Sequence, residues 1–154
     1  MKLAEGSGGV RVQTFIQTDR QRVQPHTLGV RVMLLSDRAE GRTGQRLADY
    51  GSVVDVADGL DDAVSAILDD PFGYDLFVME CDGFGGIAGA EQAISTLIAG
   101  DAKMRVMLVS REFDVPAYPL GRRTAVCLPE DVSETSFRIG FDHVLRDRAA
   151  ITMN

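Results

Sequence analysis

The sequence predicts an α/β protein with a parallel β-sheet covered by helices on both faces, and three observations point to this fold class. Short apolar runs without polar alternation recur along the chain, as is typical of strands buried on both faces. Segments with helical spacing of apolar residues separate these runs. Three of the runs end abruptly in polar residues, at the edge where open α/β sheets form their ligand sites. The 154 residues, 45% of them hydrophobic, suit a single domain with a substantial core.

The strand-like runs begin at residue 30. We interpret five segments as strands, namely Val30–Leu35, Ser52–Ala57, Leu76–Met79, Met104–Val109 and Thr124–Leu128. The first of them is closed by Ser36 and Asp37, and the fourth is closed by Ser110. The third is closed by Glu80 and followed by the glycine-rich turn Gly83–Gly86.

Helical segments follow the first, second, third and fifth of these strands. The first segment spans about Arg42 to Tyr50 and stops at Gly51, a common C-terminal stop. The others show apolar residues on one face: Leu60, Val64, Ile67 and Leu68 before Pro71; Ile87, Ala90, Ile94, Leu97 and Ile98 before Gly100; and Phe137, Phe141, Val144 and Leu145. Asp131 and Glu134 have the spacing of a capping box at the start of the last helix.

The segment between the fourth and fifth strands does not have a helical sequence. It contains Pro116, Pro119 and Gly121, and a proline inside a helix costs about 3 kcal/mol. We therefore expect a loop, or at most one turn, where a fourth crossover helix would otherwise lie.

Three regions are predicted along the chain: an N-terminal arm over residues 1–29, the α/β domain over 30–150 and a tail over 151–154. Within the arm, Val10 to Gln17 partly alternates apolar and polar residues, as an exposed strand does. This arm is interpreted as an extra edge strand or as a tail that pairs with another chain, and a disordered leader stays open as the alternative.

A strand order follows from the alternation of strands and helices, because right-handed crossovers leave few topologies. The flavodoxin-like order 2-1-3-4-5, numbered along the chain, is the natural one for five parallel strands. It places the first, third and fourth strands side by side, so that Asp37, Glu80 and Ser110 converge at one edge of the sheet.

In these features residues 30–148 resemble the receiver domain of response regulators in bacterial two-component signalling. Tyr74 and Asp75 before an apolar run match the lead-in to the phosphate-accepting aspartate of that family, and the acceptor position falls on Glu80. Ser110 matches the hydroxyl residue that ends strand 4, and Pro129 matches the proline of the Lys-Pro pair that ends strand 5.

The chain departs from the receiver pattern at three functional positions. Ser36 and Asp37 stand where the family has two Mg²⁺-binding acids, Glu80 replaces the acceptor aspartate, and Leu128 replaces the lysine. Phosphoryl transfer needs Mg²⁺ and the lysine to neutralise developing charge. The resemblance therefore implies a pseudo-receiver that works by protein–protein interaction without phosphorylation, with no cofactor and at most weak Mg²⁺ binding through Asp37 and Glu80.

Several alternatives remain from the sequence alone. Arg42–Thr43–Gly44–Gln45 faintly resembles a flavodoxin phosphate loop, which would suit a small flavin-binding protein or enzyme. A genuine but inefficient phosphoacceptor would use Glu80 or Asp82, although Asp82 is expected to point elsewhere. Glu80 itself is interpreted either as a mimic of phosphoaspartate or as part of a fixed, unswitched binding module. No Ser-His-Asp or Cys-His arrangement is evident, so no enzymatic activity is expected.

Composition limits the partners and the location. A net charge of −7 and a pI of about 4.7 argue against a nucleic-acid surface. No apolar stretch is long enough for a membrane span, and Cys81 and Cys127 suit a reducing compartment, so we expect a cytoplasmic protein. The expected partner is a histidine kinase, a phosphotransferase or a transcription regulator. A homodimer through the arm, or through the face made by the fifth strand and last helix, is a further expectation.

Overall fold

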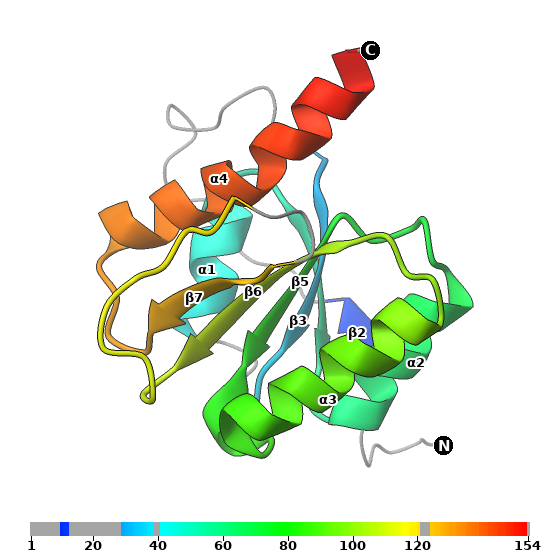
Figure 1. Cartoon of the computed structure of the whole chain (residues 1–154), viewed down its shortest axis with the longest axis horizontal. Coiled ribbons are helices and arrows are strands. Elements are labelled where there is room, and N and C mark those ends of the chain that lie inside the picture. Colours follow the sequence, from blue (N-terminus) through cyan, green and yellow to red (C-terminus); the bar gives the residue numbers. More distant parts are fainter. Residues whose placement is uncertain (1–9, 13–28, 39–40, 121–123, 154) are drawn as a thin grey trace.

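The computed structural model describes residues 10–12, 29–38, 41–120 and 124–153, which form a mainly parallel sheet between two layers of helices (Figure 1). The strands are β2 (Val10–Val12), β3 (Arg31–Leu35), β4 (Val53–Ala57), β5 (Leu76–Glu80), β6 (Arg105–Ser110) and β7 (Val126–Pro129). The helices are α1 (Arg42–Asp49), α2 (Leu60–Asp69), α3 (Gly86–Ala99) and α4 (Glu134–Met153), with a 3₁₀ turn, η3, at Cys81–Gly83. Residues 151–153 of the predicted tail thus continue α4.

The sheet has the order β2-β4-β3-β5-β6-β7, and the five strands from β3 onward are parallel. Numbered along the chain, these five strands stand in the order 2-1-3-4-5. The predicted flavodoxin-like fold class is therefore confirmed. The five parallel strands and helices α1, α2 and α3 appear within about two residues of their expected bounds, the usual uncertainty of element ends, whereas α4 extends to Met153.

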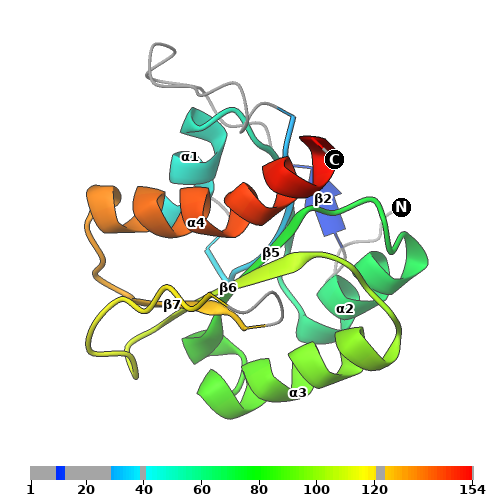
Figure 2. The ribbon, with the colours of Figure 1, turned by 45° about the horizontal axis from the view of Figure 1, so that its top comes forward.

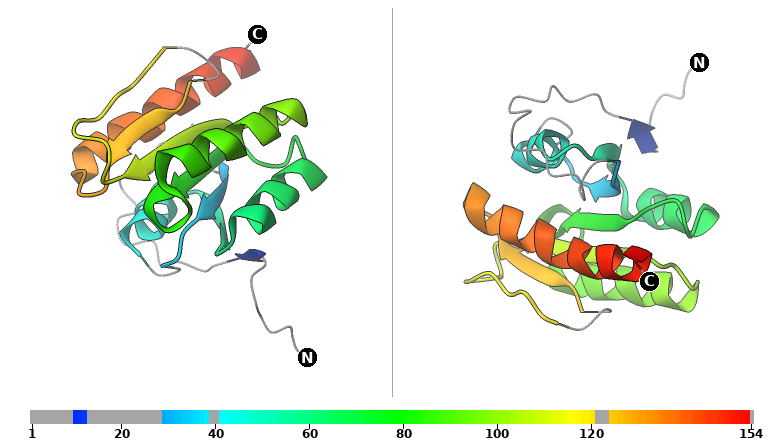
Figure 3. Two further views of the ribbon diagram at one scale, coloured as in Figure 1. Left: turned by 60° about the horizontal axis from the view of Figure 1, so that its bottom comes forward. Right: turned by 90° about the horizontal axis from the view of Figure 1, so that it is seen from above.

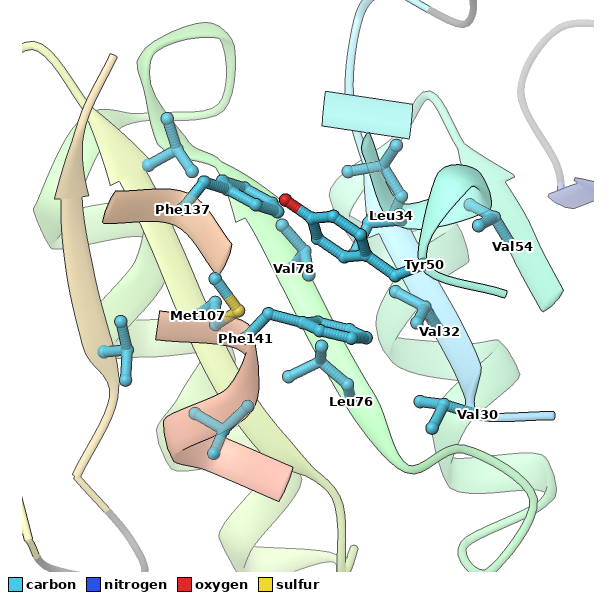
Figure 4. Packing of buried hydrophobic residues seen from close by; sticks show 14 of the residues in the cluster. Val30, Val32, Leu34, Tyr50, Val54, Leu76, Val78, Met107, Phe137 and Phe141 are labelled. Carbon is cyan, nitrogen blue, oxygen red and sulfur yellow. The ribbon is translucent and has the colours of Figure 1, made fainter. Parts of the chain in front are cut away.

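The two faces of the sheet carry separate cores because successive side chains of a strand point to opposite faces. Helices α1 and α4 cover one face, and α2 and α3 cover the other (Figures 2 and 3). The α1/α4 core is centred on the Tyr50 ring, whose centroid lies 4.9 Å from Phe141 and 6.2 Å from Phe137 (Figure 4). None of the helices in the described ranges is long and apolar enough to cross a membrane.

Part of the N-terminal arm forms the extra edge strand that was one of its three interpretations. Val10–Val12 pairs antiparallel with β4, with Val10 opposite Ala57 and Val12 opposite Asp55. Residues 1–9 and 13–28 of the arm lie outside the described residues. Because a sheet edge exposes unpaired backbone groups, β2 shields the edge of β4.

Removal of the arm is expected to destabilise the domain modestly. A chain that starts at Gly29 loses the β2–β4 pairing and should melt a few degrees lower, at about 2–4 °C per kcal/mol for a domain of this size. Thermal melting followed by circular dichroism, with light scattering for mass, makes the comparison. Equal melting points and equal masses for the two chains would show that the edge strand contributes nothing.

The segment after β6 is a loop, as its prolines predicted. Within residues 111–120 and 124–125 there is no helix, and Ala117 instead forms an antiparallel bridge with Cys127 on the outer edge of β7. The Tyr118 hydroxyl donates to the Ser136 carbonyl of α4 (3.0 Å), and a ring nitrogen of His143 lies 2.6 Å from the Pro119 carbonyl. The loop thus covers the second sheet edge.

The start of α4 differs from the predicted capping box of Asp131 and Glu134. The Ser133 hydroxyl accepts the Ser136 N–H at 3.1 Å, so Ser133 is the N-cap. Asp131 lies two residues further upstream, in the turn that follows β7, and instead lines the cavity described below. A cap must immediately precede the helix, which makes Ser133 the residue in position.

A buried carboxylate holds the opposite, N-terminal end of the sheet together. Asp55 is 3% exposed and accepts from the Tyr74 hydroxyl (2.6 Å) and the Arg31 guanidinium (3.0 Å). Burial, together with the hydrogen bond to Asp55, raises the pKa of Tyr74 to about 12. Asp75 accepts the Arg31 N–H at 2.9 Å. The Tyr-Asp lead-in to β5 therefore has a structural role here, far from the candidate site.

Candidate functional site

Glu80, the last residue of β5, has both carboxylate oxygens engaged by hydroxyl groups. The Ser36 hydroxyl donates to Oε1, and the Thr43 hydroxyl of α1 donates to Oε2 at 2.7 Å. Ser36 is 2% exposed, and its oxygen also accepts the Arg38 N–H at 2.9 Å. Glu80 thus ties the end of β3 and the first turn of α1 to the end of β5, and we call this arrangement the hydroxyl clamp.

Asp82 forms a second hydrogen-bonded group at the same edge, in the 3₁₀ turn after β5. The Ser110 hydroxyl donates to Oδ1 at 2.6 Å, while the Arg111 N–H (2.9 Å) and Nε (3.2 Å) donate to Oδ2. The expectation that Asp82 points away from the site is therefore wrong. Burial alone would raise the pKa of Asp82, but the hydrogen bonds from Ser110 and Arg111 outweigh it and lower the pKa below its usual value.

Strand register explains why Glu80 and Ser110 do not bond each other. Glu80 pairs with Val109, a residue of the α1/α4 core, so the next residue of β6, Ser110, faces the opposite side. Ser36 follows Leu35, which belongs to the α2/α3 core, and therefore shares the face of Glu80. The three strand ends converge as predicted, but their side chains divide into two groups.

Leu128 of β7 lies level with Glu80 of β5 across the sheet, with Val109 of β6 between them. Its register partner is Val109, and its side chain is 0% exposed within the α1/α4 core. The resemblance to receivers places the lysine of that family at this position. Here the position is filled by an apolar side chain that closes the core.

The carboxylates of this edge fit a divalent cation poorly. Asp37 is exposed and lies against Gly83, where an added Cβ would approach Asp37 Oδ2 to 2.9 Å. The oxygens of Glu80 and Asp82 already accept hydrogen bonds, whereas Mg²⁺ demands near-octahedral oxygen ligands. Among the described residues, no group of three or more His, Cys, Asp or Glu side chains is placed to hold a metal. The described carboxylates of this edge therefore do not fit Mg²⁺.

The glycine-rich turn positions the start of α3 beside this edge. Gly85 and Gly86 have φ angles of 92° and 67°, which other residues rarely adopt. The close packing leaves the Glu112 carboxylate within 3.1 Å of the Ile87 N–H, at the positive end of the helix.

Burial raises the pKa of the neighbouring Cys81 thiol to about 12, so this thiol is not a thiolate nucleophile at neutral pH.

An open cavity of about 630 Å³ lies at this edge of the sheet, between α1, the turn after β5 and the loop that precedes α4. Its charged lining residues are Asp37, Arg38, Arg42, Arg46, Glu80, Asp82, Arg111, Glu130 and Asp131. Its apolar lining comes from Val109, Val132 and Phe137. Thr43 and Glu80 of the hydroxyl clamp also line this cavity, as do Asp82 and its partner Arg111.

Thr43 and the cavity arginines are site residues that our sequence analysis did not assign. The signal was present, because Arg42–Thr43–Gly44–Gln45 stood out as a faint phosphate loop. The predicted helix over Arg42–Tyr50 already placed this segment in its first turn, and what the sequence did not show is that the Thr43 side chain faces the end of β5. Side-chain partners across 37 residues are set by packing, not by local pattern.

Comparison with solved structures agrees with this architecture. The N-terminal domain of a response regulator/sensory box/GGDEF three-domain protein from Carboxydothermus hydrogenoformans aligns with a TM-score of 0.60 and 19% identity, over 79% of this chain and 98% of that one. A fusion carrying the trimeric coiled coil of yeast Spc42 (amino acids 181–211) aligns with a TM-score of 0.60 and 18% identity, over 79% and 80% of the two chains. No family model and no curated protein matches the sequence. The likeness establishes a shared fold.

Proposed function

We propose that this chain is an atypical receiver module of two-component-type signalling that acts by binding another protein and does not use phosphorylation. The partner class is a histidine kinase, a phosphotransferase or a transcription regulator. The proposed location is the cytoplasm, where thiols such as those of Cys81 and Cys127 stay reduced.

The observation that carries this proposal is the hydroxyl clamp on Glu80. A phosphate acceptor must present a free carboxylate oxygen in line with the incoming phosphoryl group. Here one oxygen accepts from Ser36 and the other from Thr43. The apolar Leu128 supplies no cation to balance the developing charge.

The same geometry favours a fixed binding module over a phosphoaspartate mimic. A phosphoaspartate mimic at Glu80 would have to act through a contact with Ser110, the hydroxyl residue that ends β6. Ser110 donates to Asp82 instead. Asp82 is also a poor phosphate acceptor, because both of its carboxylate oxygens already accept hydrogen bonds from Ser110 and Arg111. The negative charge of Asp82 in turn strengthens these hydrogen bonds.

We expect the purified protein to resist phosphorylation by small-molecule donors. Incubation with acetyl phosphate and Mg²⁺, followed by intact-mass measurement, should show no stoichiometric phosphoryl adduct, because neither Glu80 nor Asp82 presents an unengaged oxygen. A chain bearing one phosphoryl group per molecule would refute the proposal. An authentic receiver domain treated in parallel confirms that the donor is active.

The binding role is tested by partner capture from the native cell with the unchanged chain and with Glu80→Lys as bait. A partner retained by the first and lost by the second, with melting curves that show both baits folded, places the interaction at this edge of the sheet. Its affinity should be the same with and without acetyl phosphate. A partner that binds only after donor treatment would instead indicate a phosphorylation-dependent receiver.

A further inference from the structure

Two neighbouring segments at the carboxyl edge of the sheet each hold the other through a carboxylate. The turn η3 supplies Asp82, which accepts hydrogen bonds from Ser110 and Arg111 at the end of β6. The segment after β6 supplies Glu112 in return, and its Oε2 accepts the Ile87 N–H in the first turn of α3 at 3.1 Å. Hydrogen bonds to a charged acceptor are roughly twice as strong as neutral ones, so this exchange ties η3, α3 and the end of β6 together.

Ser110 links the two carboxylates into one network. Its side chain is 0% exposed, and its hydroxyl donates to Asp82 while it accepts the Glu112 N–H at 3.0 Å. The Phe113 N–H donates to the Ser110 carbonyl at 3.3 Å, which closes this part of the chain into a turn. Because the hydroxyl is buried, water does not readily replace Asp82 as its acceptor.

Burial decides which contact of Asp82 matters most. Arg111 also approaches Glu130 at 3.9 Å, but the side chains of Arg111 and Glu130 are 75% and 46% exposed. An ion pair between such exposed groups contributes little to stability. The Asp82 side chain is only 23% exposed and accepts from a fully buried hydroxyl. The network therefore depends chiefly on the bond between Asp82 and Ser110.

The backbone of α3 leaves room for the Glu112 carboxylate. Gly86 has a φ of 67°, and a Cβ added there would lie 2.5 Å from Glu112 Oε2, so a side chain at this position would displace the carboxylate. The first turn of α3 contains no acidic residue of its own. Glu112 thus supplies the negative charge that a helix N-terminus favours and satisfies one of its free N–H groups.

The turn fixed by this network begins the loop between β6 and β7. Further along the loop, Ala117 and Cys127 exchange two backbone hydrogen bonds of 2.8 and 3.0 Å, which form an isolated bridge. Such a bridge has no adjacent ladder, so it lasts only while the loop around it is confined. Confining one residue costs about 1–2 kcal/mol of backbone entropy. Release of residues 111–113 should therefore weaken the bridge, although the contacts of Tyr118 and His143 with α4 still hold the far end of the loop.

We propose that Asp82 is a built-in conformational lock, which holds the loop after β6 and the start of α3 in one arrangement through Ser110 and Glu112. The lock needs no phosphoryl group, because the charge that it requires belongs to the chain. Its consequence for signalling rests on the proposed function: a partner that binds at this edge of the sheet meets a single arrangement of the loop. The lock itself is a property of the isolated chain.

Amide hydrogen exchange of the full chain, followed by NMR, tests the lock at a distance from Asp82. The readouts are Ala117 and Cys127, whose N–H groups donate to each other's carbonyls and not to Asp82. Asp82→Ala removes all three acceptor contacts with Ser110 and Arg111. We expect both readout amides to exchange about tenfold faster or more in this variant.

A second variant reaches the same network from its other side. Ser110→Ala removes the buried hydroxyl with almost no change in shape, and we expect it to accelerate exchange of the same two amides about tenfold. Because both changes break one network, the double variant should exchange little faster than either single variant. Exchange is measured with and without a low concentration of denaturant, since local opening exposes little surface and responds weakly to it.

Glu80→Gln is the matched control. It removes the charge of another carboxylate at this edge, but the partners of Glu80 are Ser36 and Thr43, which lie outside the loop. Exchange of the Ala117 and Cys127 amides by local opening should change less than about twofold in this variant.

Two results would overturn the lock: unchanged exchange of the readout amides in both Asp82→Ala and Ser110→Ala, or equal acceleration by Glu80→Gln. Melting curves show which variants are folded, and Ser110→Ala keeps the test decisive if Asp82→Ala does not fold. Failure of the proposed function is distinguishable, because hydrogen exchange requires no partner. A phosphoryl adduct after treatment with acetyl phosphate would refute that function without changing the exchange rates of the untreated chain.

Discussion

Replacement of Glu80 by alanine is expected to lower the free energy of unfolding by about 2–4 kcal/mol. The carboxylate accepts two hydrogen bonds, from Ser36 and from Thr43, and bonds to a charged acceptor each contribute about 1.5–3 kcal/mol. Both hydroxyl groups belong to buried residues, so their loss of a partner is not fully repaired by water. This loss also frees the first turn of α1 from the end of β5.

Chemical denaturation at neutral pH measures this effect against a matched control. Asp37→Ala removes a carboxylate from the same edge of the sheet, but Asp37 is exposed, so its loss should change stability by less than about 0.5 kcal/mol. Glu80→Gln keeps the shape and one acceptor oxygen, and an intermediate loss of about 1–2 kcal/mol is expected.

A double-mutant cycle of Glu80→Gln with Thr43→Val isolates the 2.7 Å bond, since valine keeps the shape of threonine without its hydroxyl. Coupling of about 1 kcal/mol or more would confirm that Thr43 and Glu80 act together. If Glu80→Ala and Asp37→Ala change the free energy of unfolding by equally small amounts, the hydroxyl clamp does not hold β3, β5 and α1 together. The Glu80 carboxylate would then be free to act as an acceptor, contrary to the proposed function.

The fold was predictable because its signals are local and repeated. Unbroken apolar runs such as Val30–Leu35, alternating with amphipathic helices, predict a parallel sheet without knowledge of individual side-chain contacts. Pro116 and Pro119 correctly predicted a loop, since proline excludes a regular helix. Even the convergence of Asp37, Glu80 and Ser110 followed from the strand order alone.

The partners within the site were less predictable, because side-chain direction alternates with each residue. A sequence shows where a strand ends within about two residues, and a shift of one residue reverses the face. Thus Ser110 could be placed beside Glu80 but bonds Asp82, and Asp82 itself was expected to turn away. The Thr43 bond joins a helix to a strand 37 positions along the chain, and no local pattern encodes it.

Leu128 is the position where core and site meet, and substitution by lysine tests whether a cation can be placed beside Glu80. Its side chain is fully buried between β6 and α4, and Val109 separates it from Glu80. An ammonium introduced there has no partner in the apolar core, and Glu80 already accepts two hydrogen bonds. We expect Leu128→Lys to destabilise the fold by about 3 kcal/mol or more, as burial of an unpaired charge does.

The free energies of unfolding of Leu128→Lys and Leu128→Met, compared across pH, show whether the introduced ammonium is buried without a partner or reaches Glu80. Methionine nearly conserves volume and should cost less than about 1.5 kcal/mol. If the lysine is buried without a partner, its pKa in the folded state lies below that of the unfolded chain, so the unfolded state binds more protons and the variant gains stability as pH rises. The difference in free energy of unfolding between the two variants should then narrow from pH 7 toward pH 10. If instead the ammonium reaches Glu80, the pKa of the lysine is higher in the folded state than in the unfolded chain. The difference between the variants is then small at pH 7 and widens as the pH rises toward the folded-state pKa. That second pattern would mean that one substitution places beside Glu80 the kind of cation that phosphoryl transfer requires, and only the hydroxyl clamp would then oppose an acceptor role for Glu80.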